Sequence, residues 1–330
     1  MTLAVVIPVW NGRPLLEKLL ASLQRQTLHP NELLVVDNGS SDGAPEAARA
    51  FGARVISMGR NAGFAPAVNC GIHHFRQARV DWIAVLNSDV ELAPNYFELL
   101  TAATGWFATG KILAAAAPHP IDGSFDLVSR AGAAWRAGHG RADGPIWSLR
   151  QRIWAAPWTA AVFRTELFDR TGLLDERFES YLEDVDFGLR CAMRGLAGEY
   201  LPQATAWHHG SASLGRWHPE TVRRIARNQV WLLARHYSNR DLARCCWPAI
   251  VGQLLWGLTA LRHGAGFAWL RGKWEGLRGF AKMRPDPAIF HPGLLQHLRA
   301  NELQIRELQR ASGSDFYWRL YFLLTTCEAK

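Results

Sequence analysis

Several signatures that would assign this chain to a common protein class are missing from it. Its five cysteines form no C-x-x-C pair and are odd in number, which argues against a disulfide framework or a zinc site and favours a reducing compartment. The first residues lack a basic segment and a cleavage site, so we expect no signal peptide. Neither G-x-G-x-x-G nor a Walker loop is present. No RNP-like or helix-turn-helix signal is present either, so no nucleic-acid partner is expected.

The net charge of +8 is concentrated in one part of the chain. Residues 214–284 contain 13 Arg or Lys and three acids, together with six of the 15 tryptophans. Basic residues interleaved with tryptophan suit an anionic membrane surface. The apolar run at 245–261 is shorter than the ~20 residues of a bilayer span. We therefore expect an amphipathic helix lying in the membrane plane rather than a true span, and a buried core helix of a C-terminal bundle is an equally open alternative.

Short apolar runs alternate with helical patterns over the first 90 residues. The runs at 3–9, 33–36, 54–57 and 82–86 are predicted to be strands, and the alternation predicts a parallel sheet with helices on both faces. Trp10, Asp37 and Asp89 follow three of these strands, so they should converge at the carboxyl edge, where such sheets bind ligands. Ordinary turn formation is the alternative for any one of these loops.

The chain after this region is less regular. Residues 92–117 are rich in alanine and are predicted to be helical, whereas residues 118–153 are expected to form loops and short strands. A last strand is expected at 198–207, leading to His208.

Three acids, Glu183, Asp184 and Asp186, precede an apolar pattern at helical spacing. The pattern predicts a helix that begins at these acids, where backbone N–H groups and the helix dipole favour anions. A carboxylate held there stays ionised and can accept a proton from a substrate hydroxyl. Helix capping without catalysis is the alternative for such a group of acids.

In their order, these segments resemble the inverting family 2 glycosyltransferases with the GT-A fold, especially the rhamnosyltransferase-like members that build bacterial surface polysaccharides. The matching stretches are VVIPVWN at 5–11, VVDNGSSDG at 35–43, NAGF at 61–64 with Asn69 and Gly71, LNSD at 86–89, LDERF at 174–178, EDVD at 183–186, and His208. The resemblance covers about residues 1–235. It implies a Rossmann-like, mostly parallel α/β sheet flanked by helices, with a C-terminal helical extension.

The resemblance also implies roles for matching residues. Asp184 would be the general base. Asp37 would accept a hydrogen bond from the imide N–H of uracil or thymine, and Trp10 would stack on that base. Asp89 would hold a divalent metal, Mg²⁺ or Mn²⁺, with His208 as a further ligand. The neighbouring His209 is the competing candidate for that ligand.

Further contacts are implied for a larger group of residues. The expected nucleotide-binding set is completed by Pro8, Asn11, Asn61, Gly63, Asn69, Asn87 and Ser88, and the expected acceptor pocket consists of Glu183, Trp158 and Thr159. Many members carry Asp-x-Asp at the metal motif, whereas this chain has Asn87-Ser88-Asp89. One fewer carboxylate should weaken metal affinity.

Together these observations predict a catalytic domain at 1–215, with a nucleotide-binding half at 1–90 and an acceptor half at 91–215. Residues 216–330 are expected to form a basic, helical region with peripheral membrane contact through 240–284. The expected reaction moves a sugar from a UDP- or dTDP-sugar, with dTDP-rhamnose as the analogy, to a lipid-linked or polysaccharide hydroxyl with inversion. The expected location is the inner face of a bacterial cytoplasmic membrane.

Two other functions fit the sequence less well. A sugar-1-phosphate nucleotidyltransferase needs a glycine-rich, basic loop after the first strand, and this chain has Val9-Trp10-Asn11-Gly12-Arg13 there. A non-catalytic nucleotide- or glycan-binding protein on the same fold is disfavoured by the intact set of Asp37, Asp89 and Asp184.

Overall fold

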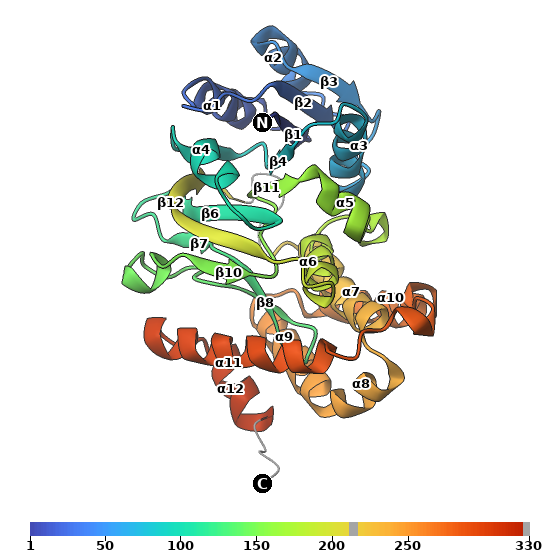
Figure 1. Cartoon of the computed structure of the whole chain (residues 1–330). Coiled ribbons are helices and arrows are strands. Elements are labelled where there is room, and N and C mark those ends of the chain that lie inside the picture. Colours follow the sequence, from blue (N-terminus) through green and yellow to red (C-terminus); the bar gives the residue numbers. More distant parts are fainter. Residues whose placement is uncertain (211–216, 326–330) are drawn as a thin grey trace. The chain divides into compact units, whose positions relative to one another are not determined.

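A ten-stranded sheet organises the N-terminal part of the chain (Figure 1). The computed structural model describes residues 1–210 and 217–325. Four of the predicted strands are present as β1 (Leu3–Val9), β2 (Glu32–Asp37), β3 (Arg54–Ser57) and β4 (Trp82–Leu86). They are parallel and adjacent in the order β4-β1-β2-β3. Their carboxyl ends therefore share one edge of the sheet, as predicted.

Three helices connect these strands: α1 (Arg13–Gln24), α2 (Ala44–Phe51) and α3 (Phe64–Gln77). Leu16, Leu19, Leu20 and Leu23 of α1 are buried, because their spacing puts them on one helix face. Helix α3 lies very close to β1, since a Cβ on Gly71 would come within 2.4 Å of Val6 Cγ1. Only glycine fits there without a shift of strand or helix.

The other half of the sheet is mixed. Strand β11 (Ala160–Arg164) runs antiparallel to both β4 and β6 (Phe107–Ala114), and β12 (Gly198–His208) is parallel to β6. Two reversals restore the direction, so β6 and β12 point the same way as β4. The C-terminal end of β12, where His208 lies, therefore emerges at the same edge as the ends of β1, β2 and β4. The predicted α/β class is confirmed.

The helix predicted at 92–117 is wrong for most of its length. This part contains β5 (Val90–Leu92), the short α4 (Tyr96–Thr101) and the central strand β6. The small residues that suggested a helix allow close strand contacts, because a Cβ on Gly110 would lie 2.0 Å from the Ala204 carbonyl oxygen. Pairing with β11 and β12 has overridden local helix propensity.

The irregular part contains short strands, as predicted. These are β7 (Ile121–Gly123), β8 (Asp126–Val128), β9 (Ala134–Arg136) and β10 (Gln151–Ile153), with 3₁₀ turns at Pro145–Trp147 and Glu176–Phe178. Helices α5 (Thr165–Thr171) and α6 (Glu183–Met193) follow. Helix α6 begins at the first of the three acids, as predicted.

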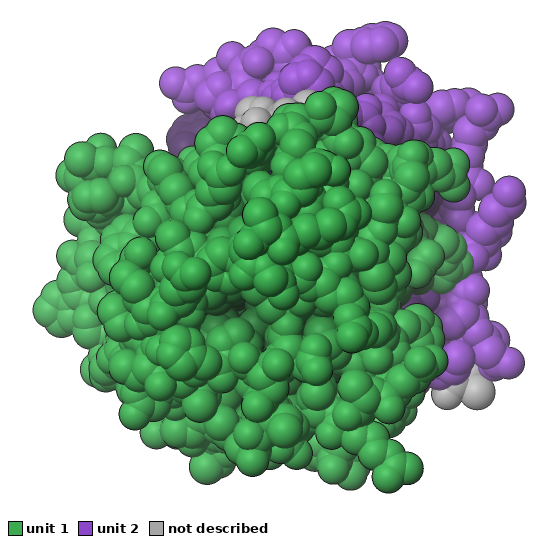
Figure 2. Space-filling model, turned by 90° about the horizontal axis from the view of Figure 1, so that it is seen from above, with its two compact units in different colours: residues 1–126, 138–213 green, residues 127–137, 214–330 purple. Residues whose placement is uncertain are grey.

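The chain divides into two compact units, which Figure 2 colours separately. Unit 1 is Met1–Asp126 with Gly138–Ser213, and unit 2 is Leu127–Ala137 with Leu214–Lys330. The predicted boundary at 215/216 lies outside the described residues. Residues 127–137, which the sequence analysis placed with the catalytic part, belong to unit 2. The division into a catalytic and a C-terminal region stays a prediction.

Unit 2 is mainly helical. Its helices are α7 (Pro219–His236), α8 (Asn239–Arg244), α9 (Cys246–Arg262), α10 (Gly266–Met283), α11 (Leu294–Ser312) and α12 (Phe316–Thr325), with a 3₁₀ turn at Pro287–Ile289 (Figure 1). Helices α7 and α10 pack closely, since a Cβ on Gly272 would lie 2.2 Å from the Arg223 carbonyl oxygen. In the described parts of the chain, no helix combines the length and apolar character that a bilayer span requires.

Candidate active site

Asp37 and Trp10 end neighbouring strands at the carboxyl edge. Asp37 is buried, and its carboxylate accepts hydrogen bonds from Ser40 N at 2.9 Å and Ser57 Oγ at 3.2 Å. In the register of β1 and β2, Asp37 pairs with Val9, the residue before Trp10. Trp10 itself is 37% exposed. The strand register thus places a hydrogen-bonded carboxylate and an accessible aromatic residue, the two groups predicted to bind a base, at neighbouring positions of this edge.

Asn38 links the end of β2 to the NAGF loop. Its amide Nδ2 donates to Gly63 O at 2.8 Å, and its Oδ1 accepts from Ala62 N at 3.0 Å. The loop in turn contacts the segment before α6, because Phe64 N donates to Ser180 Oγ at 3.1 Å and the next residue, Ala65, donates through its N to Glu179 O at 2.9 Å. Asn38 was part of a matching stretch but was not singled out as a site residue. Its hydrogen bonds join two motifs that are far apart in the sequence, and the NAGF loop adds the contact with the segment before α6.

The segment that leads into α6 has an unusual backbone. Glu179, Tyr181 and Leu182 have φ angles of +62°, +74° and +68°. Positive φ is uncommon for residues other than glycine, and such conformations cluster at functional sites. Asp184 follows in the first turn of α6, where its Oδ1 accepts a hydrogen bond from Val185 N at 2.8 Å. The segment holds Asp184 at the helix N-terminus, where its charge is favoured.

Asp186 has a structural role in this helix. It is completely buried, and its Oδ2 accepts a hydrogen bond from Arg190 Nε at 3.0 Å. The same guanidinium donates to Thr171 O at 2.5 Å and Leu173 O at 2.8 Å. The pair therefore joins α6 to the end of α5.

Replacement of Asp186 by alanine is expected to lower the free energy of unfolding by about 3–5 kcal/mol, because it leaves the Arg190 charge buried without its carboxylate. Urea denaturation followed by circular dichroism measures this loss. Glu17→Ala is the matched control, since Glu17 forms an i,i+4 pair with Arg13 at 2.8 Å in which both side chains are about half exposed. That change should cost less than about 1 kcal/mol. Equal losses for the two variants would contradict the assignment.

Asp89 and His208 meet at the same edge of the sheet. Asp89 lies in the turn after β4, and its Oδ1 is 3.1 Å from His208 Nε2. The competing candidate, His209, points elsewhere, because its Nε2 bonds Glu91 Oε1 at 2.7 Å. Two donors that are each about 2.1 Å from an octahedral Mg²⁺ and at right angles are about 3 Å apart. The pair therefore fits two adjacent ligand positions.

A metal at this position would need ligands from elsewhere. Within residues 1–210 and 217–325, no group of three or more His, Cys, Asp or Glu side chains is arranged to hold a metal ion. Mg²⁺ is commonly bound via one or two carboxylates, with water and substrate phosphates completing the shell. Asp89 supplies one such carboxylate, and His208 lies beside it as a nitrogen ligand.

Asp122 is a contact that the sequence analysis missed. Its Oδ2 lies 2.9 Å from His208 Nδ1, so it orients the imidazole with Nε2 towards Asp89. Burial lowers the pKa of His208, but the hydrogen bonds and charges of Asp122 and Asp89 outweigh burial and raise that pKa to about 9. Any metal bound at Nε2 must displace this proton. Asp122 lies in the stretch without periodicity, and no sequence signal marked it.

The other predicted nucleotide-binding residues are placed in different surroundings. Asn69 is buried, with its Nδ2 donating to Leu174 O at 2.9 Å and its Oδ1 accepting from Leu174 N at 3.1 Å. These bonds give it a packing role. Asn11 Oδ1 accepts from Ser41 N at 2.9 Å, which connects two matching loops. Asn61 Oδ1 accepts from Gly63 N at 3.1 Å inside its own loop.

Pro8, Asn87 and Ser88 also lie near the edge. Pro8 is buried in β1, whereas Asn87 and Ser88 lie half-buried in the turn that carries Asp89. Asn87 N donates to Thr159 O at 2.9 Å, which ties the metal motif to the start of β11. Direct contacts of these residues with a nucleotide stay predictions.

The predicted acceptor residues are largely enclosed. Trp158 is buried in an aromatic cluster, with its ring centroid 4.4 Å from that of Phe163 and 5.1 Å from that of Phe187. Thr159 and Glu183 are also buried. Trp158 therefore packs against α6 through Phe187. Contact of these three residues with the acceptor stays a prediction.

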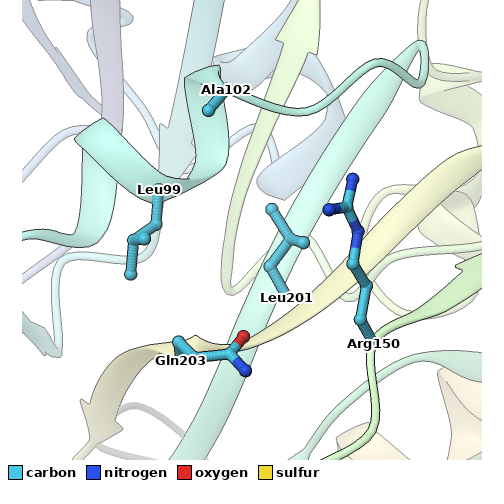
Figure 3. Close-up of a pocket in the computed structure, with 5 residues that line it drawn as sticks. All are labelled: Leu99, Ala102, Arg150, Leu201 and Gln203. Atoms are coloured by element: carbon cyan, nitrogen blue, oxygen red, sulfur yellow. The ribbon is translucent and has the colours of Figure 1, made fainter.

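A pocket of about 290 Å³ lies elsewhere in unit 1 (Figure 3). It is lined by Leu99, Ala102, Arg150, Leu201 and Gln203. Arg150 forms an ion pair with Glu199, whose Oε2 accepts a hydrogen bond from Arg150 Nε at 2.9 Å. None of these residues belongs to the predicted site, and we assign this pocket no role in the reaction.

Comparison with known proteins gives a consistent result. The family model described as "Glycosyl transferase family 2" matches residues 4–145. One relative is the N-acetylglucosaminyl-diphospho-decaprenol L-rhamnosyltransferase of Mycobacterium tuberculosis (strain ATCC 25618 / H37Rv). It is 31% identical over 246 residues, which are 65% of this chain and 78% of that protein.

Solved structures support the same fold. GalNAc-T7 with UDP, GalNAc and Mn²⁺ superposes with a TM-score of 0.61 at 15% identity, covering 86% of this chain and 56% of that chain. S. aureus TarS 1-349 in complex with UDP-GlcNAc superposes with a TM-score of 0.50 at 16% identity, covering 96% and 93%. At such identities the likeness shows the fold, which is the predicted GT-A fold. Together with the family match and the rhamnosyltransferase relative, it establishes that this chain is a glycosyltransferase of family 2.

Proposed function

We propose that this chain transfers a sugar from a pyrimidine nucleoside diphospho-sugar, of the dTDP-rhamnose class, to a hydroxyl of a lipid-linked glycan with inversion. The observation that carries the proposal is the 3.1 Å approach of Asp89 to His208 at the sheet edge where Asp37 also lies. The donor and acceptor classes are supported by the relative's name, which specifies an L-rhamnosyltransferase and a decaprenol-linked diphospho-sugar acceptor.

The chain's own residues would divide the work as follows. Asp37 binds the imide N–H of the base, and Trp10 stacks on its face. Asp184 accepts the proton of the acceptor hydroxyl as that oxygen attacks the anomeric carbon. The bond from this carbon to the diphosphate breaks on the opposite face, which inverts the stereochemistry.

Asp89 and His208 are the side chains that would hold Mg²⁺ or Mn²⁺. When bound, the metal supplies positive charge that stabilises the leaving nucleoside diphosphate. Asp122 keeps the His208 ring in the required orientation through Nδ1. Asp89 is the single carboxylate of the motif Asn87-Ser88-Asp89, so it is the group of that motif that would attract the cation.

We also propose that the chain works at the inner face of a bacterial cytoplasmic membrane, with contact through residues 240–284. A lipid-linked acceptor is confined to a membrane, so the enzyme must reach that surface. The segment has eight Arg or Lys and two acids, which favours an anionic leaflet.

The donor class can be tested by thermal denaturation with dTDP, UDP, GDP and NAD, each with and without Mn²⁺. A ligand that binds only the folded protein raises the melting temperature, and at a hundred times its Kd it adds about 2.7 kcal/mol. We expect stabilisation by dTDP or UDP that increases with Mn²⁺, and little effect of GDP or NAD. The stabilising base then selects the sugar donor for a transfer assay.

Absence of stabilisation by either pyrimidine diphosphate, with or without metal, would contradict the proposed donor. A larger rise in melting temperature with GDP than with dTDP or UDP would show that the site binds a purine, which contradicts the roles proposed for Asp37 and Trp10.

A further inference from the structure

The two helices α9 and α10 expose most of the large apolar side chains on the surface. Among the described residues, nine of the seventeen exposed large hydrophobic side chains lie on these two helices. A contiguous exposed apolar surface marks an interaction site, whereas single exposed residues are normal. These nine residues are therefore the surface to explain.

On α9 they form one stripe. The exposed residues are Trp247, Ile250, Leu254, Leu258 and Leu261, and three of them are leucines exposed by 55–64%. Their spacing of three or four residues puts them on a single helix face. Pro248, Gly252 and Leu255, on the other side of α9, are buried. The exposed stripe is thus a defined surface of a folded helix.

On α10 the arrangement is the same. Phe267, Leu270, Trp274 and Leu277 are 82%, 57%, 60% and 62% exposed, again at intervals of three or four. The opposite face carries Gly272 and Gly276, which lie against α7: a Cβ on Gly276 would come within 3.0 Å of the Arg227 carbonyl oxygen. This close packing prevents α10 from rotating its apolar stripe inward.

The two helices form one hairpin. Only residues 263–265 separate them, and Gly257 of α9 faces the Trp269 ring of α10, where an added Cβ would lie 2.7 Å from Cε2. We call the two stripes together the hairpin surface. It consists of Trp247, Ile250, Leu254, Leu258 and Leu261 of α9 with Phe267, Leu270, Trp274 and Leu277 of α10.

Positive charges flank the hairpin surface. On α10, Arg271, Arg278 and Lys282 are exposed and follow one another at helical spacing beside the apolar stripe. The Arg278 guanidinium lies over the Trp274 ring at 5.1 Å from its centroid. Exposed Arg262 ends α9. An apolar face with Trp, Phe and Leu beside a basic face is typical of helices that lie in a membrane interface.

We propose that the hairpin surface binds the surface of an anionic lipid bilayer, with its apolar side chains at the headgroup level and its arginines and lysine on lipid phosphates. A second copy of this chain fits less well, because a face-to-face dimer would bring like charges together. The inference rests on the proposed function, which explains why the enzyme would bind a membrane. The surface itself is identified from the structure of unit 2 alone.

The test is flotation of the full chain with vesicles of phosphatidylcholine, with and without phosphatidylglycerol. We expect binding that requires phosphatidylglycerol and weakens with salt. Leu258→Glu combined with Leu270→Glu should reduce vesicle binding by ~100-fold or more, since each change removes an apolar anchor and adds an anion. Leu303→Glu on α11 is the matched control, because Leu303 is equally exposed at 62% and lies outside the hairpin surface. It should bind as the unaltered protein does.

Transfer assays separate this inference from the proposed function. With an N-acetylglucosaminyl diphosphate acceptor on a short, water-soluble chain, the double variant should keep the unaltered rate, whereas its rate on the same headgroup anchored in vesicles should fall. Vesicle binding equal to that of the unaltered protein would overturn the inference. So would a dimer in sedimentation that the double variant abolishes without any vesicle binding. Vesicle binding without transfer to either acceptor would overturn the proposed function and leave the hairpin surface standing.

Discussion

Asp184→Asn is expected to reduce the rate of sugar transfer by ~10²–10⁴-fold, the usual contribution of a general base. The amide keeps the size of the side chain but cannot accept the proton of the acceptor hydroxyl. Asp184 lies in the first turn of α6, after a segment with three positive φ angles. Hydrogen bonds from Phe64 N and Ala65 N to Ser180 and Glu179 fix the start of that segment. Nucleotide binding should stay nearly unchanged, because the base is bound by other residues.

The measurement is the transfer rate under saturating donor, together with the melting temperature in dTDP or UDP. Asp169→Asn serves as the control, since Asp169 is 59% exposed and pairs with Arg76 at the surface. The control should keep full activity. If Asp184→Asn transferred sugar at the control's rate, another group would have to be the base. If it lost nucleotide stabilisation as well, the loss of activity would reflect a damaged site.

Asp89→Asn is expected to remove the increase in nucleotide stabilisation that Mn²⁺ provides. It should also lower the transfer rate by ~10³-fold, because the bound metal contributes several kcal/mol of charge stabilisation and each 1.4 kcal/mol changes the rate by about a factor of ten. The effect should be large because the motif Asn87-Ser88-Asp89 has no second carboxylate to substitute. Thermal denaturation in nucleotide with and without Mn²⁺ measures the metal effect independently of turnover.

Glu91→Gln is the matched control for this change. Glu91 is two residues away on β5 and pairs with His209 at 2.7 Å, so it shares the local backbone but points to the other histidine. Its Mn²⁺ response should remain. A full Mn²⁺ response in Asp89→Asn would contradict the metal role of Asp89. Loss of the response in Glu91→Gln would assign the metal to Glu91 and His209.

The sequence alone was enough for the elements whose signal is local. The apolar runs ending in Trp10, Asp37 and Asn87 predicted parallel strands with a polar edge, because a buried strand flanked by turn residues has a recognisable pattern over a few positions. The acids at 183–186 predicted the start of α6, because helix N-termini favour anions. The order of the motifs identified the family, which no single motif could do.

Tertiary structure decided everything that depends on which distant segments meet. Residues 107–114, within the stretch predicted to be helical, form the central strand β6 because β11 and β12 pair with them. Asp122 contacts His208, which is 86 residues away in the sequence, and the side chain of Asn69 hydrogen-bonds the backbone of Leu174. The exposed stripes of α9 and α10 became visible only once the buried face of each helix was known. A local sequence pattern indicates which side of a segment is buried, but not which distant segment packs against it. That partner is determined by the tertiary fold, so these contacts could not be predicted from the sequence.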